Sequence, residues 1–304
     1  MAILVVGSVA FDSIKSPSGQ AERVLGGAAS YFALAASNFT QVRTIAVVGD
    51  DFTPKEEAVL TSRGVDISGI ERVRDGKTFF WAGEYASDNL NEAKTLRTDL
   101  NVFQGFDPKI PASWSDTEFL FLANIDPVLQ SNVRSKMPQV KLVGGDTMNY
   151  WINDHRTALL ETIKTIDILL INDAEVKSIA DDKSLPRAAS KVLKLGPKML
   201  VVKHGEYGAT IFFGDGSHPF RAPALPIEEV VDPTGAGDSF AGGFMGYLAS
   251  QGEVTRESLK RAMFYGGVMG SFAVERFGTE RLQHLTREEI DVRFQLFRQL
   301  THLD

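Results

Sequence analysis

Short apolar runs alternate with helical patterns along most of the chain, and this alternation limits the fold more than any other feature of the sequence. The apolar runs are residues 3–6, 119–122, 140–143, 168–171 and 199–202, and the helical patterns include residues 127–136, 154–165 and 185–195. Strands joined through helices form right-handed crossovers, which place successive strands parallel in one sheet. We therefore predict an α/β fold with a mostly parallel sheet. Because no repeat, linker or low-complexity segment interrupts residues 1–304, we expect one domain.

A glycine-rich stretch near the C-terminal third of the chain predicts a tight turn that opens a helix. Residues 231–244 read Val-Asp-Pro-Thr-Gly-Ala-Gly-Asp-Ser-Phe-Ala-Gly-Gly-Phe. The first backbone N–H groups of a helix lack intrahelical partners and carry partial positive charge, so this turn is a candidate phosphate site. Gly235 and Gly237 allow close backbone approach, and Asp238 would stand beside the phosphate. A carboxylate there can accept the proton of an attacking hydroxyl, as in a kinase, whereas a helix-capping Asp after a simple turn is the alternative.

The same fourteen residues resemble the C-terminal signature of the ribokinase-like (PfkB) family of sugar and nucleoside kinases. The resemblance runs from Gly7 to about Gly278. It implies a ribokinase-like three-layer sandwich with a mostly parallel central sheet and a small β lid. It further implies that Asp238 is the catalytic base and that Gly235, Ala236 and Gly237 form the anion hole.

Two features near the N-terminus are candidates for binding the phosphoryl acceptor. Asp12 follows the first predicted strand, and we expect it in the loop beyond that strand, where ligands of open α/β sheets bind. The family has a substrate-binding Asp at this place. Gly26 and Gly27 precede an apolar helix at 31–39 and resemble the family's N-terminal Gly-Gly signature.

The acceptor region also departs from the ribokinase pattern. That pattern continues with Lys and later Asn, whereas this chain has Ala28 and Tyr31, so the resemblance does not imply ribose itself. Tyr31 is included among the candidate substrate-binding residues. Asn149, a short distance after the apolar run 140–143, is a further candidate for contact with substrate or phosphate, with a simple turn as the alternative.

An amide and a carboxylate follow the apolar run 168–171. Asn172 and Glu175 are three residues apart and would share one side of a first helical turn. They could order waters bound to Mg²⁺, which prefers to be held in this way. By themselves they would be an N-cap and its capping-box acid. The resemblance favours the metal, because Asn-x-x-Glu is a family motif tied to Mg²⁺ and phosphate.

The nucleotide site is predicted on two segments. Lys203, Gly205 and Gly208 lie in a connection that looks like the family's Gly-x-x-Gly segment at the nucleotide, with a surface hairpin as the alternative. Lys203 could meet a phosphate as a point charge. Thr234, in the turn before the anion hole, is expected to contact the nucleotide. ATP and Mg²⁺ are therefore the expected cofactors.

A K⁺ site is a further hypothesis. Several members of the resembled family bind K⁺ through backbone carbonyls and a carboxylate beside the anion hole. Asp232 and the segment 273–278 occupy the matching places. A carboxylate that only bonds its own turn is the alternative, and both readings stay open here.

Two insertions are expected to build the lid, at about 12–25 and 74–103. Residues 78–85 are aromatic and prone to form a strand, with a core strand of the main sheet as the alternative. A closing lid excludes water that would otherwise accept the phosphoryl group. A homodimer through the lid is also an expectation.

Composition excludes several classes of function. The chain has no cysteine, so thiol nucleophiles, thiolate metal sites and disulfides are ruled out. The net charge of −7 argues against nucleic acid and anionic membranes as partners. No apolar run approaches the ~18 residues of a membrane span, and no secretory leader is recognised, so we expect a cytoplasmic protein.

The sequence thus predicts an ATP-dependent, Mg²⁺-requiring kinase that phosphorylates a hydroxyl of a sugar or related polyol. A nucleoside kinase is the alternative enzyme, because aromatic side chains could stack a base: Phe11, Tyr31, Phe80 and Trp81. A non-catalytic sugar or nucleotide sensor is a third reading. Asp238 argues against the sensor, because a pure binder gains little from a carboxylate beside a bound phosphate.

Overall fold

The computed structural model describes residues 1–301. The strands of the main sheet are β1 (Ala2–Val6), β4 (Gln41–Gly49), β5 (Asp66–Val73), β8 (Phe119–Leu122), β9 (Leu142–Gly145), β10 (Ile168–Asn172), β11 (Met199–Lys203), β12 (Ala209–Phe213) and β13 (Phe220–Ala222). The helices are α1 (Ala28–Ala36), α2 (Pro54–Thr61), α3 (Pro127–Ser135), α4 (Asn149–Asp154), α5 (Arg156–Ile163), α6 (Asp173–Ala180), α7 (Leu185–Leu193), α8 (Ala236–Gln251), α9 (Arg256–Ala273), α10 (Glu280–Gln283) and α11 (Arg287–Thr301). Short 3₁₀ turns are η1 (Asn101–Gly105), η2 (Ala112–Trp114) and η3 (Gly205–Tyr207).

The main sheet is mostly parallel, which confirms the predicted fold class. Its strand order is β13-β12-β11-β10-β9-β8-β1-β4-β5. The neighbours from β11 to β5 are all parallel, and the two antiparallel pairs, β11 with β12 and β12 with β13, lie at one edge. Parallel strands need crossover helices on the faces of the sheet, so both faces are covered.

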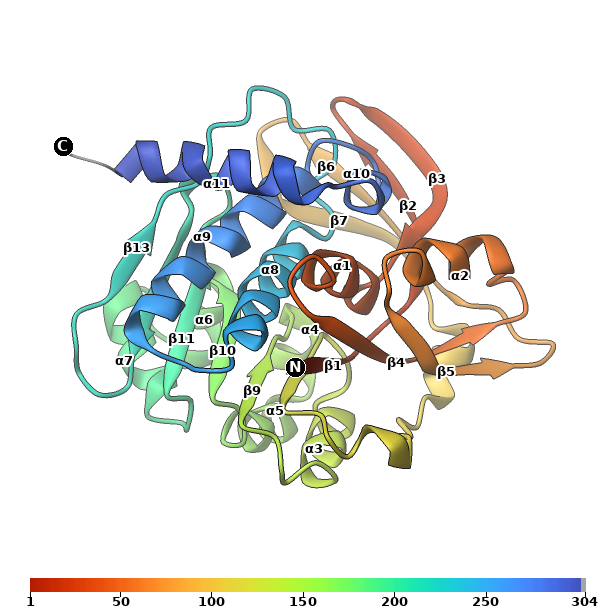
Figure 1. Cartoon of the computed structure of the whole chain (residues 1–304), viewed down its shortest axis with the longest axis horizontal. Coiled ribbons are helices and arrows are strands. Elements are labelled where there is room, and N and C mark those ends of the chain that lie inside the picture. The colour runs from red at the N-terminus through yellow and green to blue at the C-terminus, as the bar shows by residue number, and fades with distance from the viewer. Residues whose placement is uncertain (302–304) are drawn as a thin grey trace.

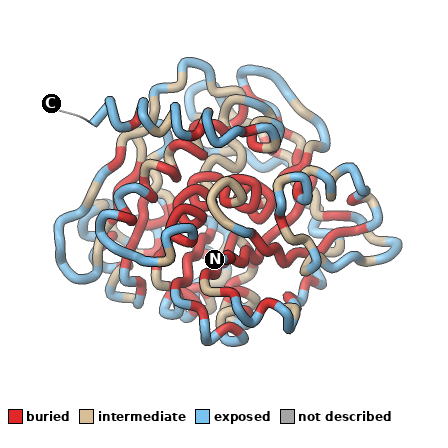
Figure 2. Tube along the Cα trace, in the orientation of Figure 1, coloured by how far each residue is buried: buried red, intermediate tan, exposed pale blue. Residues whose placement is uncertain are grey.

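Alternate residues of each central strand face different helical layers. In β1, Ile3 and Val5 belong to the core formed with α1, α8 and α9, whereas Leu4 and Val6 belong to the core formed with α3, α5, α6 and α7. Figure 1 shows α1, α8 and α9 next to one another on one face. The buried trace in Figure 2 follows the sheet and these helices, while the outer side of α11 is exposed. The arrangement is a three-layer α/β/α sandwich, as predicted.

Small residues let α8 pack closely against its two neighbouring helices. A Cβ on Gly242 would lie 2.4 Å from the Phe32 carbonyl oxygen of α1. A Cβ on Gly243 would lie 2.5 Å from the Tyr265 carbonyl oxygen of α9. Both distances are too short for any side chain, so glycine is required at these two positions. This packing fixes the direction in which the first turn of α8 points.

A second, smaller sheet has the order β3-β2-β6-β7. Its strands are β2 (Ala10–Ser16), β3 (Gly19–Gly26), β6 (Phe79–Ala86) and β7 (Asn89–Asp99), and the outer pairs are antiparallel while β2 and β6 are parallel. The aromatic segment 78–85 therefore contributes to this lid rather than to the main sheet. Asp12 lies inside β2, so its predicted placement in a loop is wrong, because only residues 7–9 separate β1 from β2.

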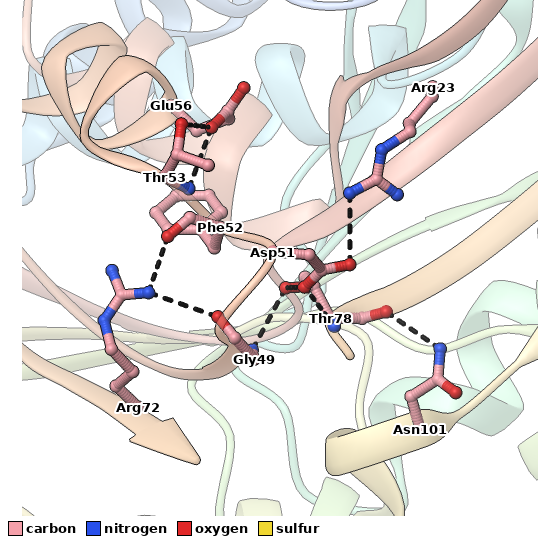
Figure 3. A network of polar contacts seen from close by, with 9 residues as sticks. All are labelled: Arg23, Gly49, Asp51, Phe52, Thr53, Glu56, Arg72, Thr78 and Asn101. Carbon is pink, nitrogen blue, oxygen red and sulfur yellow. Dashed lines mark hydrogen bonds and ion pairs between the residues drawn. The ribbon is translucent and has the colours of Figure 1, made fainter. Parts of the chain in front are cut away.

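A polar network joins the base of the small sheet to the end of β4 (Figure 3). The Asp51 Oδ1 atom accepts hydrogen bonds from the Thr78 backbone N–H at 2.7 Å and from the Thr78 hydroxyl at 2.6 Å. Arg23 of β3 pairs with the other Asp51 oxygen at 3.1 Å. The Gly49 N–H donates to the Thr78 hydroxyl at 3.0 Å, and Asn101 donates to the Thr78 carbonyl at 2.9 Å. One carboxylate thus fastens both insertions to the main sheet.

Two predicted boundaries differ from the structure for identifiable reasons. The run predicted as a strand at 140–143 is β9 at Leu142–Gly145, because the Met245 and Ile166 side chains fill the space beside Gly144 and Gly145. The single helix predicted at 154–165 is α5 alone, and His155, at φ −127°, separates it from α4. Within residues 1–301, none of the helices combines the length and apolar character that crossing a bilayer requires.

Candidate active site

Three neighbouring strands end at one edge of the main sheet in polar side chains. Asp146 follows β9, Asn172 ends β10 and Lys203 ends β11, and Asn172 and Lys203 are paired in the sheet register. The first turn of α8 meets this edge, because a Cβ on Gly237 would lie 3.0 Å from the Lys203 Nζ atom. The structure therefore brings together residues that are far apart in the sequence, at the edge where open α/β sheets bind ligands.

The first turn of α8 is open. Gly235 precedes it at φ +72°, in the left-handed region that favours glycine, and no side chain caps the helix. The Ala236 N–H donates to the Pro233 carbonyl at 3.2 Å. The N–H groups of Gly237 and Asp238 have no such acceptor in the described part of the chain. Unpaired N–H groups at a helix N-terminus suit an anion, so the donors fit a phosphate group.

Asp238 lies half-buried in this first turn. Burial raises its pKa to about 7, the Asp146 carboxylate adds to the rise, and the Lys203 ammonium opposes it. A carboxyl group with a pKa near 7 is well suited to accept a proton at physiological pH, because efficient proton transfer needs a pKa close to the working pH.

Lys203 forms an ion pair that the sequence analysis did not foresee. Its Nζ atom lies 3.0 Å from Asp146 Oδ2, and both side chains are largely buried, with 17% and 7% exposed. Burial acts to lower the pKa of Lys203, but Asp146, Glu175 and Asp238 outweigh it and raise that pKa. Asp146 follows its strand directly, which is the signal that selected Asn172, so it could have been found in the same way.

Asn172 and Glu175 form a complete capping box at the start of α6. The Glu175 N–H donates to Asn172 Oδ1 at 2.8 Å, and the Asn172 N–H donates to Glu175 Oε2 at 2.8 Å. Burial, together with Asp146, raises the pKa of Glu175. A carboxylate has two oxygens with several lone pairs, so the cap leaves acceptor capacity for metal-bound water. Among residues 1–301, no group of three or more His, Asp or Glu side chains is placed to hold a metal ion directly.

A further buried carboxylate, Asp12, lies in strand β2 of the lid, close to the start of α1. Asp12 is 4% exposed, and a Cβ on Gly26 would lie 1.8 Å from its Oδ2 atom, so glycine is required there. Gly27, at φ +90°, precedes α1 and passes close to the Ser8 carbonyl. Burial and then Asp232 raise the pKa of Asp12 to about 8, and a hydrogen bond from the Gly27 N–H opposes them. Asp12, Gly26 and Gly27 therefore lie together, and their role in binding substrate stays a prediction.

Tyr31 connects this unit with the open helix turn. Its ring fills the space beside Gly235, where a Cβ would lie 2.3 Å from the ring. The Tyr31 side chain is 1% exposed, and its hydroxyl finds no hydrogen-bond partner among the described residues. Burial, followed by Asp12, raises its pKa. A buried hydroxyl without a protein partner is a fitting contact for a polar group of a bound molecule.

The lid touches the opposite side of the site at two points. The Tyr85 hydroxyl of β6 accepts a hydrogen bond from the Thr234 hydroxyl at 3.2 Å. A Cβ on Gly205 would lie 1.8 Å from the Asn91 side chain of β7, so η3 and the lid are in contact. Sequence reasoning did not select Tyr85, because nothing in its neighbourhood marks the strand face that would point toward Thr234.

Asp232 joins the turn before α8 to the segment after α9. Its Oδ1 atom accepts from the Thr234 N–H at 2.8 Å, and its Oδ2 atom accepts from the Gly278 N–H at 2.8 Å. The N–H groups of Val231 and Asp232 both donate to the Val274 carbonyl. The two segments named for K⁺ are therefore adjacent, and the Asp232 carboxylate, 0% exposed, bonds the backbone of both.

Two predicted residues lie apart from these contacts. Asn149 is exposed at the start of α4. Gly208, at φ +90°, packs against the Ala222 carbonyl of β13, where a Cβ would be 2.2 Å away, so its conformation serves the β11–β12 connection.

One of the aromatic candidates for base stacking, Phe11, is 3% exposed, and the Arg23 guanidinium lies 3.9 Å above its ring.

Comparison with known proteins agrees with this geometry. Residues 2–285 match the family described as "pfkB family carbohydrate kinase". A cytidine kinase of Thermococcus kodakarensis is 33% identical over 270 residues, which cover 86% of this chain and 94% of that protein. A nucleoside kinase of Methanothermobacter thermautotrophicus is 26% identical over 313 residues, which cover 91% of each chain.

Solved structures show the same fold. The nucleoside kinase of Methanocaldococcus jannaschii, described as an archaeal member of the ribokinase family, superposes with a TM-score of 0.76 at 22% identity, over 97% of this chain and 98% of that one. A putative ribokinase II from E. coli, in complex with ATP and Mg²⁺, superposes with a TM-score of 0.77 at 21% identity, over 97% of this chain and 99% of the other.

Proposed function

Because the chain belongs to the pfkB family of carbohydrate kinases, we propose that it transfers the γ-phosphoryl group of ATP to a hydroxyl of a nucleoside. The observation that carries this proposal is Asp238 beside unpaired N–H groups in the first turn of α8, with Lys203 facing that turn. The sugar acceptor expected from the sequence gives way to the nucleoside alternative, because the two full-length relatives are named for cytidine and nucleosides.

In the proposed reaction Asp238 is the general base. Its carboxylate takes the proton of the acceptor hydroxyl, the hydroxyl oxygen bonds to the γ-phosphorus, and the bond from that phosphorus to the bridging oxygen breaks so that ADP leaves with the electron pair. The Gly237 and Asp238 N–H groups, with the dipole of α8, stabilise negative charge on the phosphoryl oxygens. Gly235 and Ala236 would belong to the anion hole by shaping the turn that presents these N–H groups.

The acceptor would bind between Asp12 and Tyr31. A buried carboxylate accepts hydrogen bonds from two adjacent hydroxyls, which is what the ribose of a nucleoside presents. The unpaired Tyr31 hydroxyl supplies a donor beside it. Gly26 and Gly27 keep the backbone close to the acceptor, while the exposed position of Asn149 gives it no part in this proposal.

ATP would bind along Lys203, Gly205 and Thr234, and Gly208 would shape the connection that carries Gly205. Asn172 and Glu175 would hold Mg²⁺ through water, in the manner this ion prefers. When bound, Mg²⁺ neutralises charge on the phosphate oxygens. Contact of the lid with Gly205 and Thr234 would close the site and exclude water during transfer.

We also propose that the chain forms a homodimer through the lid. We take the insertions 12–25 and 74–103 as the lid of a single domain over residues 1–304. The edge strands of the small sheet are β3 and β7, and β7 is followed by the exposed Leu100 and carries the exposed Leu96. Unpaired edges with apolar side chains favour pairing with a second copy. Light scattering would give the mass of a dimer, and the mass of a monomer would contradict this part.

A turnover screen tests the proposed function. ADP release with Mg-ATP would be measured for cytidine, uridine, adenosine, inosine, ribose, fructose and glycerol, each against a reaction without acceptor. We expect acceptor-dependent ADP with at least one nucleoside, and a matching nucleoside monophosphate by mass spectrometry. Turnover with a sugar alone would restore the sugar reading. No acceptor-dependent ADP would favour the non-catalytic sensor.

A further inference from the structure

Asp146 is a buried carboxylate that the proposed reaction does not yet use. Three bonds besides its ion pair fix it. The Thr147 N–H donates to Oδ1 at 2.8 Å, the Gln130 side chain donates to the Asp146 carbonyl at 3.0 Å, and the Asp146 N–H donates to the Leu122 carbonyl at 3.0 Å. With only 7% of its side chain exposed, Asp146 is held in one place before any ligand binds.

Lys203, in contrast to the fixed Asp146, has a side chain that can reach several partners. Its ammonium ends a flexible four-carbon chain and is drawn to whichever carboxylate lies nearest. Asp146, Glu175 and Asp238 all act on it electrostatically. In the structure its hydrogen-bond partner is Asp146, at 3.0 Å, and its Nζ atom lies over the first turn of α8 beside Gly237. An ammonium that paired with Asp238 instead would stabilise the ionised carboxylate and weaken it as a base.

We propose that Asp146 is a positioning residue for phosphoryl transfer, which holds the Lys203 ammonium over the start of α8 and away from Asp238. This inference rests on the proposed function. It assigns the three charges separate tasks: Asp146 anchors, Lys203 meets the phosphoryl oxygens, and Asp238 stays free to take the acceptor proton. Preorganised charge of this kind acts without rearrangement during the reaction.

The electrostatics of Asp238 are consistent with this division. Asp146 raises the pKa of Asp238, and Lys203 lowers it. Glu175, Asp12, Tyr31 and Tyr85 also lie within electrostatic reach of Asp238. Glu175 itself responds to Asp146 and Lys203, but the direct effects of these two residues on Asp238 have opposite signs. The two replacements should therefore move the titration of Asp238 in opposite directions.

A matched control lies at the opposite end of the same strands. Asp167 precedes β10, accepts the Val143 N–H at 2.9 Å and pairs with Lys198 at 2.8 Å. It therefore has the same types of partner as Asp146, a backbone N–H and a lysine. Lys198 is 75% exposed, and this pair lies at the amino ends of the strands rather than at the site.

The test compares Asp146→Asn, Lys203→Met and Asp167→Asn. We expect Asp146→Asn to lower kcat about 10- to 100-fold, as for a group misplaced within a site, with little change in the acceptor KM. The acid limb of kcat/KM against pH should shift to lower pH in Asp146→Asn and to higher pH in Lys203→Met. Asp167→Asn should leave kcat and the limb unchanged, although its melting temperature falls like that of Asp146→Asn.

Two outcomes would overturn the inference. The first is equal kcat in Asp146→Asn and Asp167→Asn. The second is an acid limb that does not move in Asp146→Asn, which would make Asp146 a structural partner of Lys203. Wild-type turnover is measured in the same series. If the wild type shows no turnover, both the proposed function and this inference are contradicted. If the wild type turns over substrate and either outcome above is found, only the role of Asp146 is contradicted.

Discussion

Two helices begin at the same edge of the main sheet, and their first turns are completed in different ways. At α6, Asn172 and Glu175 form a full capping box, in which each side chain accepts the backbone N–H of the other residue. At α8, no side chain caps the helix, and the Gly237 and Asp238 N–H groups are left without acceptors within the described residues. Unmade hydrogen bonds at a partly buried helix end cost stability unless something else meets them. The difference indicates that the start of α6 is held by its own side chains, whereas the first turn of α8 leaves donors that a bound anion can meet.

The largest expected effect follows from removing the carboxylate at the open turn. Asp238→Asn keeps the size of the side chain and the first turn of α8 but cannot accept the acceptor proton. We expect kcat to fall about 10² to 10⁴-fold, the usual contribution of a positioned general base. The dissociation constant of Mg-ATP, measured by calorimetry, should be nearly unchanged. Wild-type kcat in this variant would leave α8 without a catalytic role.

The capped turn provides a sharper test of the contrast. Gln at the third helical position also completes a capping box, so Glu175→Gln should keep the melting temperature close to that of the wild type. If Glu175 also orders Mg²⁺-bound water, the Mg²⁺ concentration for half-maximal rate should rise on the order of 10-fold. Both quantities come from one Mg²⁺ titration and one thermal scan. An unchanged Mg²⁺ dependence would reduce Glu175 to a helix cap and widen the contrast with α8.

The open site should also cost stability in a way that depends on pH. Burial raises the pKa of Asp12 to about 8 and that of Asp238 to about 7, from 3.8. Between these limits the folded state binds more protons than the unfolded state, so the free energy of unfolding falls as pH rises. Carboxyl groups with lowered pKa, such as Asp215 and Glu289, titrate below this window.

We therefore expect a higher melting temperature at pH 5.5 than at pH 8.5. Asp12→Asn removes one of the titrating groups and should flatten that dependence. The measurement is a set of thermal scans in buffers of matched ionic strength. A melting temperature that rises over the same pH range would contradict the burial of unpaired carboxylates at the site.

The smallest effect concerns the turn that precedes α8. We propose that K⁺ binds beside Asp232 and the segment 273–278, and so orders the turn that aims the α8 N–H groups. Because Asp232 already bonds Thr234 and Gly278, the turn is largely held without the ion. Replacing K⁺ by a large organic cation at constant ionic strength should lower kcat several-fold, with little change in ATP affinity. Unchanged kcat would make Asp232 a structural residue only.

Much of the fold could be predicted from local patterns. Apolar runs predict the strands at 168–171 and 199–202. The glycine-rich turn predicts the helix after Gly235, a residue that adopts the left-handed conformation in the structure. The buried glycines that end β9 could not be assigned to a strand from the sequence, because the space beside them is filled by Met245 and Ile166, which come from other segments.

The candidate site was predictable in its residue types more than in its pairings. Asp238, Asn172 and Lys203 each stand at the end of a strand or the start of a helix, which their local sequence reveals. The partnership of Lys203 with Asp146 and the contact of Tyr85 with Thr234 join segments 57 and 149 residues apart. No local pattern determines which distant residues become partners, so the side chains of the site were predictable but their arrangement was not.

The most direct test of the account is whether Asp238 takes the proton. The measurement is kcat/KM against pH from 5.5 to 9, for the wild type and for Asp238→Asn, with both substrates well below saturation. In the wild type the value should fall about tenfold per pH unit below a pKa of about 7, as the carboxyl group of the free enzyme becomes protonated. In Asp238→Asn that limb should disappear. A limb that persists unchanged in the variant would assign the titration to another group and contradict the central claim.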